Sequence, residues 1–450
     1  MQEVQKLQPN SLDDWLPLTA SRNGNTFSTV FHIVSSGIGI QALFLPVGFA
    51  TLGWTWGIIC LLTAFAWQIY TIWLLVHLAE PVPGTRYSRY MHVAKAAFGP
   101  KLAKSLCVFP VWYLSGGTCI MLIITAGADL ETLYKIMCGG IATCEAKSLP
   151  GVVWCLLFIC IAIVVSQLLP NLNSVLKFSK TGTVTAVVYV TLLWALTIRK
   201  GRANDVSYSR VEEGKSGMAK YANILNAIGT IVLAFRGHNL VLEIQGTLPS
   251  SKFNPSSQKM WRAVKISYMT IGMCSFPLAL TGYWAYGNKV TAKEGLLSVF
   301  SQVHGHDTSR GAMGSIYLLQ IINCLCQFQI YAMPAFDSLE FRYIFKKQQQ
   351  CPRRVRAAYR FFFTGLISLL SVAFPFFPSL APFMGGLTLP FKFSYPCLMY
   401  NLIKKPDQSG TLWWLNLGLG CFGIILSVML VVATFWNLVT KGVHANFFSP

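Results

Sequence analysis

The sequence predicts an all-α polytopic membrane protein with about eleven transmembrane helices, and three observations support this fold class. Of the 450 residues, 54% are hydrophobic and only 12% are charged, a composition typical of membrane proteins. Apolar runs long enough to cross a bilayer recur along the whole chain. Basic residues gather in the segments between these runs. That placement argues against a nucleic-acid partner, although the formal net charge is +20.

The apolar runs define the candidate spans in chain order. We place them at 27–50, 55–78, 105–130, 150–169, 181–198, 221–245, 263–286, 313–339, 359–377, 381–402 and 411–439. Residues 1–26 contain no apolar core of a cleavable signal peptide, so we expect a cytoplasmic tail there. Residues 87–99 (YSRYMHVAKAAFG) predict an amphipathic helix at the membrane interface.

The distribution of basic residues predicts the orientation of the chain. An odd number of spans puts the two termini on opposite sides of the membrane. Five basic segments then lie on the side of the N-terminus: 86–104, 177–180, 252–265, 342–360 and 404–405. Positive residues favour the cytoplasmic side, so we expect a cytoplasmic N-terminus and an extracellular tail at 440–450. The basic segment 199–220 disagrees with this pattern. We expect an integral protein of the plasma membrane, surrounded by lipid.

Two spans contain residues that interrupt a helix near mid-membrane. In the first, residues 35–39 (SSGIG) precede Pro46; in the sixth, Gly229 precedes residues 234–239 (AFRGHN). Serine and glycine are poor helix formers, and proline removes a backbone donor. Freed backbone groups survive at membrane depth only inside protein or beside a watery cavity. The first stretch could instead be a kinked helix that packs through small residues.

The interrupted spans also suggest an internal repeat. Five spans occupy 27–198, five more occupy 221–402, and 411–439 adds one helix to a single transmembrane domain over 27–439. Because five is odd, the two halves would cross the membrane in opposite directions, with an interrupted span first in each. Such a pair of interrupted spans is the best sequence indication of the substrate site of a secondary transporter.

Ordered motifs along nearly the whole chain resemble a known family. Two stretches are specific, 237–245 (GHNLVLEIQ) and 282–288 (GYWAYGN). Further matches are FH at 31–32, LGW at 52–54, MWR at 260–262 and AMPAFD at 332–337. With them the chain resembles the amino acid/auxin permease family, and within it the plant lysine/histidine transporter-like branch. The resemblance implies a LeuT-like fold of 5+5 inverted repeats with discontinuous first and sixth helices, and proton-coupled uptake of amino acids.

The family geometry would aim the N–H groups of Gly37, Ile38 and Gly39 at the carboxylate of the substrate, because the N-terminus of a helix carries partial positive charge. Ser35 and Ser36 could add hydroxyl contacts.

The chain departs from the branch at Gln41, where glycine is typical. Gln41 either contacts the substrate or narrows the pocket. Tyr113 in the third span and Gln327 or Gln329 in the eighth are further candidates from their positions.

Arg236 is the most informative residue of the second interruption, where Phe235, Gly237 and Asn239 flank it. An arginine in the membrane costs ~3 kcal/mol on insertion scales, so it is functional or paired. No acidic residue lies one turn away on its own span, so its partner is an acid on another span or the substrate. If it faces the site unpaired, we expect neutral or acidic amino acids to be preferred over lysine and arginine.

His238 and Glu243 are the candidates for proton coupling. Histidine titrates near neutral pH, and burial favours the uncharged form of a carboxyl group. Each has a structural alternative: His238 could bond the carbonyls of the broken helix, and Glu243 could contact basic loop residues. Lys392, inside the tenth span, could reach the interface or pair.

Nothing in the sequence indicates an enzyme, since serines and histidines lack motifs such as GxSxG or a phosphate loop. We expect no metal and no cofactor. Cys138 and Cys144 share a polar loop on the expected outer side, where they could either form a disulfide or remain free thiols. The leading interpretation is a proton-coupled amino acid symporter whose partners are an amino acid, protons and lipid. The alternative is a transporter-like amino acid sensor with little net transport. The oligomeric state stays open.

Overall fold

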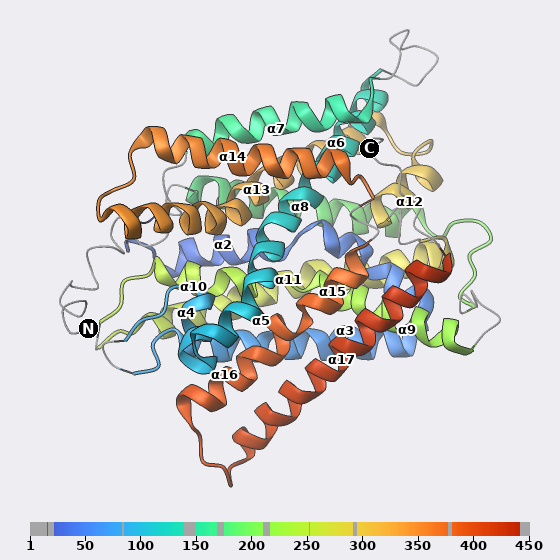
Figure 1. Cartoon of the computed structure of the whole chain (residues 1–450). Coiled ribbons are helices and arrows are strands. Elements are labelled where there is room, and N and C mark those ends of the chain that lie inside the picture. The colour runs from blue at the N-terminus through green and yellow to red at the C-terminus, as the bar shows by residue number, and fades with distance from the viewer. Residues whose placement is uncertain are drawn as a thin grey trace, which may run out of the picture.

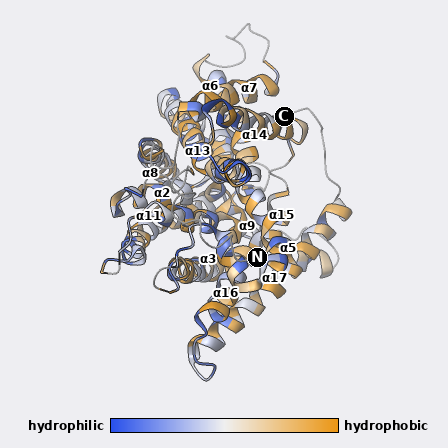
Figure 2. Ribbon diagram, turned by 60° about the vertical axis from the view of Figure 1, so that its left-hand side comes forward, coloured by the Kyte–Doolittle hydropathy of each residue, from blue (hydrophilic) through white to orange (hydrophobic). Residues whose placement is uncertain are grey.

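The computed structural model describes residues 16, 22–82, 85–138, 149–168, 175–209, 217–251, 253–290, 295–376 and 380–441. All regular elements in these ranges are helices, and many run side by side across the bundle (Figure 1). The outward faces are apolar (Figure 2), as the exposed side chains of Phe362, Phe422 and Phe435 illustrate. Water would not favour such a surface, and lipid does. The chain is therefore an integral membrane protein, as its composition predicts.

The first predicted span is divided. It consists of α2 (Thr26–Gly37), the short 3-10 helix η1 (Ile40–Phe44) and the start of α3 (Leu45–Leu78). Within α3 the backbone leaves helical geometry at Gly53, with φ 75°. A Cβ on Gly57 would touch the Phe49 ring, whereas eight helical residues would separate the two positions by about 12 Å. The chain therefore turns back at Gly53, and the rest of α3 is the second span.

The remainder of the first half follows the predicted order. The elements are α4 (Tyr90–Phe98), α5 (Pro100–Trp112), η2 (Tyr113–Gly117), α6 (Thr118–Met137), α7 (Gly151–Leu168) and α8 (Leu176–Lys200). The interfacial helix predicted at 87–99 is confirmed as a helix, α4. The third span is continuous but contains a π-helical turn, η2, just before α6.

In the second half of the chain, the first span is again divided into two helices. Its elements are α9 (Gly217–Ala234), α10 (His238–Gly246), α11 (Ser256–Tyr286), η3 (Gly287–Lys289), α12 (Gly295–His304), α13 (Arg310–Lys347), α14 (Arg353–Ala373), α15 (Ala381–Leu389), η5 (Pro390–Ser394), α16 (Tyr395–Lys404) and α17 (Thr411–Lys441). The π-turn η5 interrupts the tenth span, and α17 packs along α15 and α16 (Figure 1).

The membrane spans identified by hydropathy do not coincide one to one with the spans defined by helix geometry. Within the described residues, nine helical stretches are long and apolar enough to span a membrane. One of them, Ile40–Leu78, holds parts of two spans because of the turn at Gly53. The stretch 381–404, which is not among the nine, occupies the place of the tenth predicted span. Several helices extend beyond the predicted runs because their polar ends project past the apolar part.

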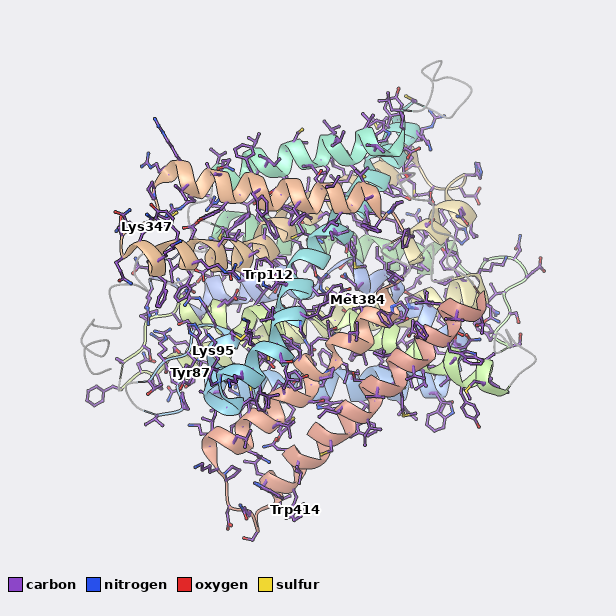
Figure 3. All side chains as sticks on the ribbon, in the orientation of Figure 1. Tyr87, Lys95, Trp112, Lys347, Met384 and Trp414 are labelled. Carbon is purple, nitrogen blue, oxygen red and sulfur yellow. The ribbon has the colours of Figure 1, made fainter. Side chains whose placement is uncertain are left out.

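Two basic residues of the predicted cytoplasmic segments lie at one end of the bundle. Figure 3 shows Lys95 of α4 and Lys347 of α13 toward the same end, together with Tyr87. α2 begins at this end (Figure 1). The opposite end holds the end of α6, where Cys138 is disulfide-bonded. Cys144 lies outside the described residues, so the pairing of the two stays a prediction.

Candidate functional site

The two interruptions are real breaks in the helices. After α2, Ile38 and Gly39 are extended, with φ −93° and −112°. After α9, Gly237 adopts a left-handed conformation with φ 112°, which glycine tolerates and other residues avoid. The breaks also meet in space, since a Cβ on Gly39 would lie 2.7 Å from Nη1 of Arg236. A single site between the two breaks is therefore built from both halves of the chain.

Arg236 occupies the junction of the two breaks and is almost fully buried. Its Nη1 donates to Oε1 of Gln41, and its Nη2 donates to Oγ1 of Thr118 at 2.9 Å. Its guanidinium carbon lies 4.4 Å from the ring centre of Tyr331. Throughout the described ranges, no carboxylate forms an ion pair with Arg236. The guanidinium is therefore held by uncharged groups from η1, α6 and α13.

The carbonyls released by the first break are bonded from α13. Nε2 of Gln327 donates to the Ile38 carbonyl at 2.6 Å, and the Tyr331 hydroxyl donates to the Ser36 carbonyl at 2.8 Å. Both donors are buried. Gln327 and Tyr331 are four residues apart, so one face of α13 carries both.

The carbonyls released by the second break are bonded from α3 and η5. Nε2 of Gln68 donates to the Arg236 carbonyl at 2.7 Å. Nζ of Lys392 donates to the carbonyls of Val232 at 3.1 Å and Phe235 at 3.4 Å. Lys392 therefore neither reaches the interface nor pairs with an acid in the described part of the chain; it binds the end of α9.

Several buried polar atoms near the breaks have no hydrogen-bond partner in the described structure. They are Oε1 of Gln68, Nδ2 of Asn239 and Oε1 of Gln327. Burying a polar atom without a partner costs about 1–3 kcal/mol. Such atoms are suited to bind the polar groups of a ligand.

The structure separates the residues predicted at the first break into two groups. Gly39, Gln41 and Gln327 lie together beside Arg236. By contrast, a Cβ on Gly37 would meet the Ile271 side chain of α11, so this glycine packs closely against α11, and contact of its N–H with a substrate stays a prediction.

The N–H expectation is wrong for Ile38, because its N–H donates to the Val34 carbonyl at 3.0 Å and closes the last turn of α2. The hydroxyl of Ser36 likewise donates within α2, to the Ile33 carbonyl at 3.1 Å. Ser35 faces α8, where a Cβ on Gly182 would meet its hydroxyl.

The other predicted residues surround the second break. Phe235 is buried against Phe65, and Tyr113 lies in η2, close enough to Arg236 for an electrostatic interaction. Asn239 is buried in the first turn of α10. Their contact with a substrate stays a prediction.

The two proton-coupling candidates lie in different surroundings. Nε2 of His238 shares a hydrogen bond of 2.8 Å with Oγ1 of Thr71, so the histidine is held at the break. Glu243 is buried further along α10, within electrostatic reach of Arg89 and Asp337. Arg89 and Asp337 form an ion pair at 2.7 Å. Glu243 thus lies beside a charged pair away from the break.

Sequence reasoning did not place four residues of the site: Gln68, Thr118, Tyr331 and Lys392. Tyr331 could have been found from the sequence, because it lies four residues after Gln327 and therefore on the same face of α13. Lys392 stood out as a charge inside a span, but its partner is a backbone carbonyl, for which no sequence pattern exists. Gln68 and Thr118 carry no local signal.

Comparison with solved structures shows the fold class. The chain superposes on MhsT in complex with L-phenylalanine with a TM-score of 0.61 at 12% identity, over 91% of this chain and 98% of that one. A Na+-coupled sialic acid symporter matches with a TM-score of 0.53 at 9% identity, over 94% of this chain and 91% of that one. The chain has the LeuT-like fold of membrane transporters, with its first and sixth spans discontinuous.

Sequence comparison then gives the family. The model of the transmembrane amino acid transporter protein family matches residues 22–440. Lysine histidine transporter-like 8 of Arabidopsis thaliana is 45% identical over 99% of this chain and 84% of its own length. Lysine histidine transporter-like 7 of the same plant is 44% identical over 98% and 90%. The chain belongs to the transmembrane amino acid transporter family, which confirms the resemblance found in the sequence; its relatives are named transporters, not enzymes.

Proposed function

We propose that this chain is a symporter that imports neutral or acidic amino acids together with protons. The observation that carries the substrate class is the position of Arg236 between the two breaks. It carries a positive charge there, and its contacts are Gln41, Thr118 and Tyr331, all uncharged. Among the described residues, no acidic side chain on another span forms an ion pair that would neutralise Arg236.

The magnitude of the charge effect favours this substrate class. A cationic side chain ~4 Å from the guanidinium, at an effective dielectric of ~20, would be repelled by about 4 kcal/mol. One added hydrogen bond contributes only about 1 kcal/mol, so it cannot offset that repulsion. A neutral side chain avoids the repulsion, and an acidic one gains a charge-assisted hydrogen bond.

The test is uptake of lysine, glutamate and alanine by the purified protein in proteoliposomes. We expect the wild-type protein to transport alanine and glutamate and to discriminate strongly against lysine. Arg236→Ala should reduce glutamate uptake most and narrow the difference between alanine and lysine. Thr118→Val is the matched control, because it removes one hydrogen bond of Arg236 and keeps the charge. Lysine uptake by the wild type equal to that of alanine would refute the substrate assignment.

One observation favours the sensor alternative. Arg236 connects the second break to η1, α6 and α13, and these contacts must rearrange if the site is to open to both sides in turn. A sensor would bind alanine or glutamate in a scintillation proximity assay while the same proteoliposomes accumulate neither. Measuring both quantities on one preparation separates the two functions.

We also propose a cytoplasmic N-terminus in the plasma membrane. The position of Lys95 and Lys347 at one end of the bundle and the disulfide-bonded Cys138 at the opposite end support this orientation, since positive residues favour the cytoplasmic side and the cytoplasm is reducing. Glycosylation tags inserted after residue 441 should be modified in cells, whereas tags near residue 10 should not. The reverse pattern would overturn the orientation.

A further inference from the structure

Lys392 is a buried cation bound to the end of a broken helix. It lies in η5, the π-turn that interrupts the tenth span, and is 1% exposed. Its ammonium donates to the carbonyls of Val232 and Phe235 at 3.1 and 3.4 Å. These carbonyls belong to the last turn of α9 and the residue after it. The last carbonyls of a helix lack helical partners and form the negative end of its dipole, so a cation stabilises them.

The helices that pack most extensively on η5 contain no carboxylate, whereas α10, whose His238 ring lies 5.6 Å from the Phe393 ring of η5, carries Glu243 further along. η5 packs against α3, α15, α16 and α17, and the carbonyls it binds belong to α9 and its end; none of these five helices contains aspartate or glutamate. The charged or titratable neighbours that act on Lys392 electrostatically are Arg236 and His238. From α4, the Tyr90 hydroxyl donates to the Phe391 carbonyl in the same turn. The helix end therefore stabilises the ammonium, while burial and Arg236 oppose it.

Opposing contributions of this kind suit a group that must bind and release a proton. With its proton, Lys392 makes charge-assisted hydrogen bonds that tie α9 to η5. When an N–H bond of the ammonium breaks, the proton passes to water in the access pathway and a neutral amine remains. The amine keeps two N–H groups but loses the charge, so its attraction to the end of α9 weakens.

We propose that Lys392 is a proton-coupling residue that links protonation to the position of α9 at the second break. The proposal rests on the proposed proton-coupled transport. The ammonium form holds the end of α9 against η5, and the amine form releases it. Because Arg236 and His238 follow directly on α9, release of this helix end also moves the substrate site.

The experiment measures two activities of the same proteoliposomes with alanine as the probe. The first is accumulation driven by an imposed gradient of about one pH unit, which supports roughly tenfold accumulation for one proton per substrate. The second is exchange of internal for external alanine at equal pH, which needs no net proton movement. Lys392→Met and Lys392→Arg are compared with wild type. Lys404→Met is the matched control, since Lys404 also donates to a backbone carbonyl, of Pro81 at 2.6 Å, but is exposed.

We expect Lys392→Met to lose the gradient-driven accumulation and to keep exchange. Lys392→Arg should also lose accumulation, because a guanidinium keeps its proton. Lys404→Met should behave as wild type. Accumulation at the wild-type level in either Lys392 variant would overturn the proposal. A Lys392→Met protein that still binds alanine but loses both exchange and accumulation would also overturn it, because Lys392 would then have a purely structural role.

Two further outcomes identify which idea fails. If the wild-type protein transports alanine but does not respond to the pH gradient, the proposed proton coupling itself is wrong. If the wild type responds, and His238→Gln or Glu243→Gln loses accumulation while Lys392→Met retains it, coupling belongs to that residue and the assignment to Lys392 is wrong.

Discussion

The two breaks occupy corresponding places in the two halves of the chain but are stabilised by different chemistry. At the first break, uncharged side chains of α13 donate to the released carbonyls of Ser36 and Ile38. At the second, the main donor is the ammonium of Lys392, and the break itself contributes the guanidinium of Arg236. Both cations of the site therefore belong to the second break.

This difference assigns distinct roles to the two halves. The hydrogen bonds that Gln327 and Tyr331 make at the first break involve no group that gains or loses a proton near neutral pH. A break stabilised in this way should keep its geometry as pH changes. The second break carries two positive charges, and neither forms an ion pair with a carboxylate of the described residues, so its energy depends on protonation and on the charge of the ligand. We infer that the first break is a fixed platform and the second responds to the proton and the substrate.

The strongest test of this contrast removes the donor of the first break. Gln327→Met leaves the Ile38 carbonyl unbonded, which should lower the free energy of unfolding by about 1–3 kcal/mol and reduce alanine uptake. Gln329→Met is the matched control, because Gln329 is equally buried and donates to the Ala162 carbonyl at 3.1 Å, away from the breaks. Thermal unfolding in detergent and uptake per folded protein measure the two effects.

The control should lose similar stability and keep uptake. Equal loss of uptake in both variants would show that the first break has no special role, and an unchanged stability of Gln327→Met would show that its hydrogen bond contributes little.

A smaller effect is expected from a methyl group added at each break. Gly237→Ala forces alanine into a left-handed conformation, at a cost of about 1–2 kcal/mol. Gly39 has an extended backbone, which alanine adopts without strain, so Gly39→Ala should lower stability less than Gly237→Ala does. Its new methyl group would instead displace Arg236 and Gln41, at 2.7 and 2.9 Å, and weaken alanine binding. Thermal unfolding and a binding assay on both variants check this, and a fully stable Gly237→Ala protein would contradict it.

Predictions from local pattern were the most successful part of the sequence analysis. The run 234–239 predicted the second break because a glycine and an arginine disfavour an apolar helix at that point, and the break lies there. The turn at Gly53 lies in the short connection predicted between the spans at 27–50 and 55–78, so the chain reverses where the sequence placed it, although helical geometry continues on both sides. The close packing of Gly37 against Ile271 of α11 was visible only in the structure, because it depends on where α11 lies.

By itself the sequence determined the membrane class, the succession of spans and the two interruptions, because hydropathy and helix propensity act over a few consecutive residues. Only the tertiary structure decided the partners of the charged groups. Arg236 meets Gln41 across 195 positions of sequence, and Lys392 meets Val232 across 160. The first of these contacts joins two side chains and the second ends on a backbone carbonyl that every residue possesses. Which groups become partners depends on how the helices pack, and no local pattern of residues contains that information.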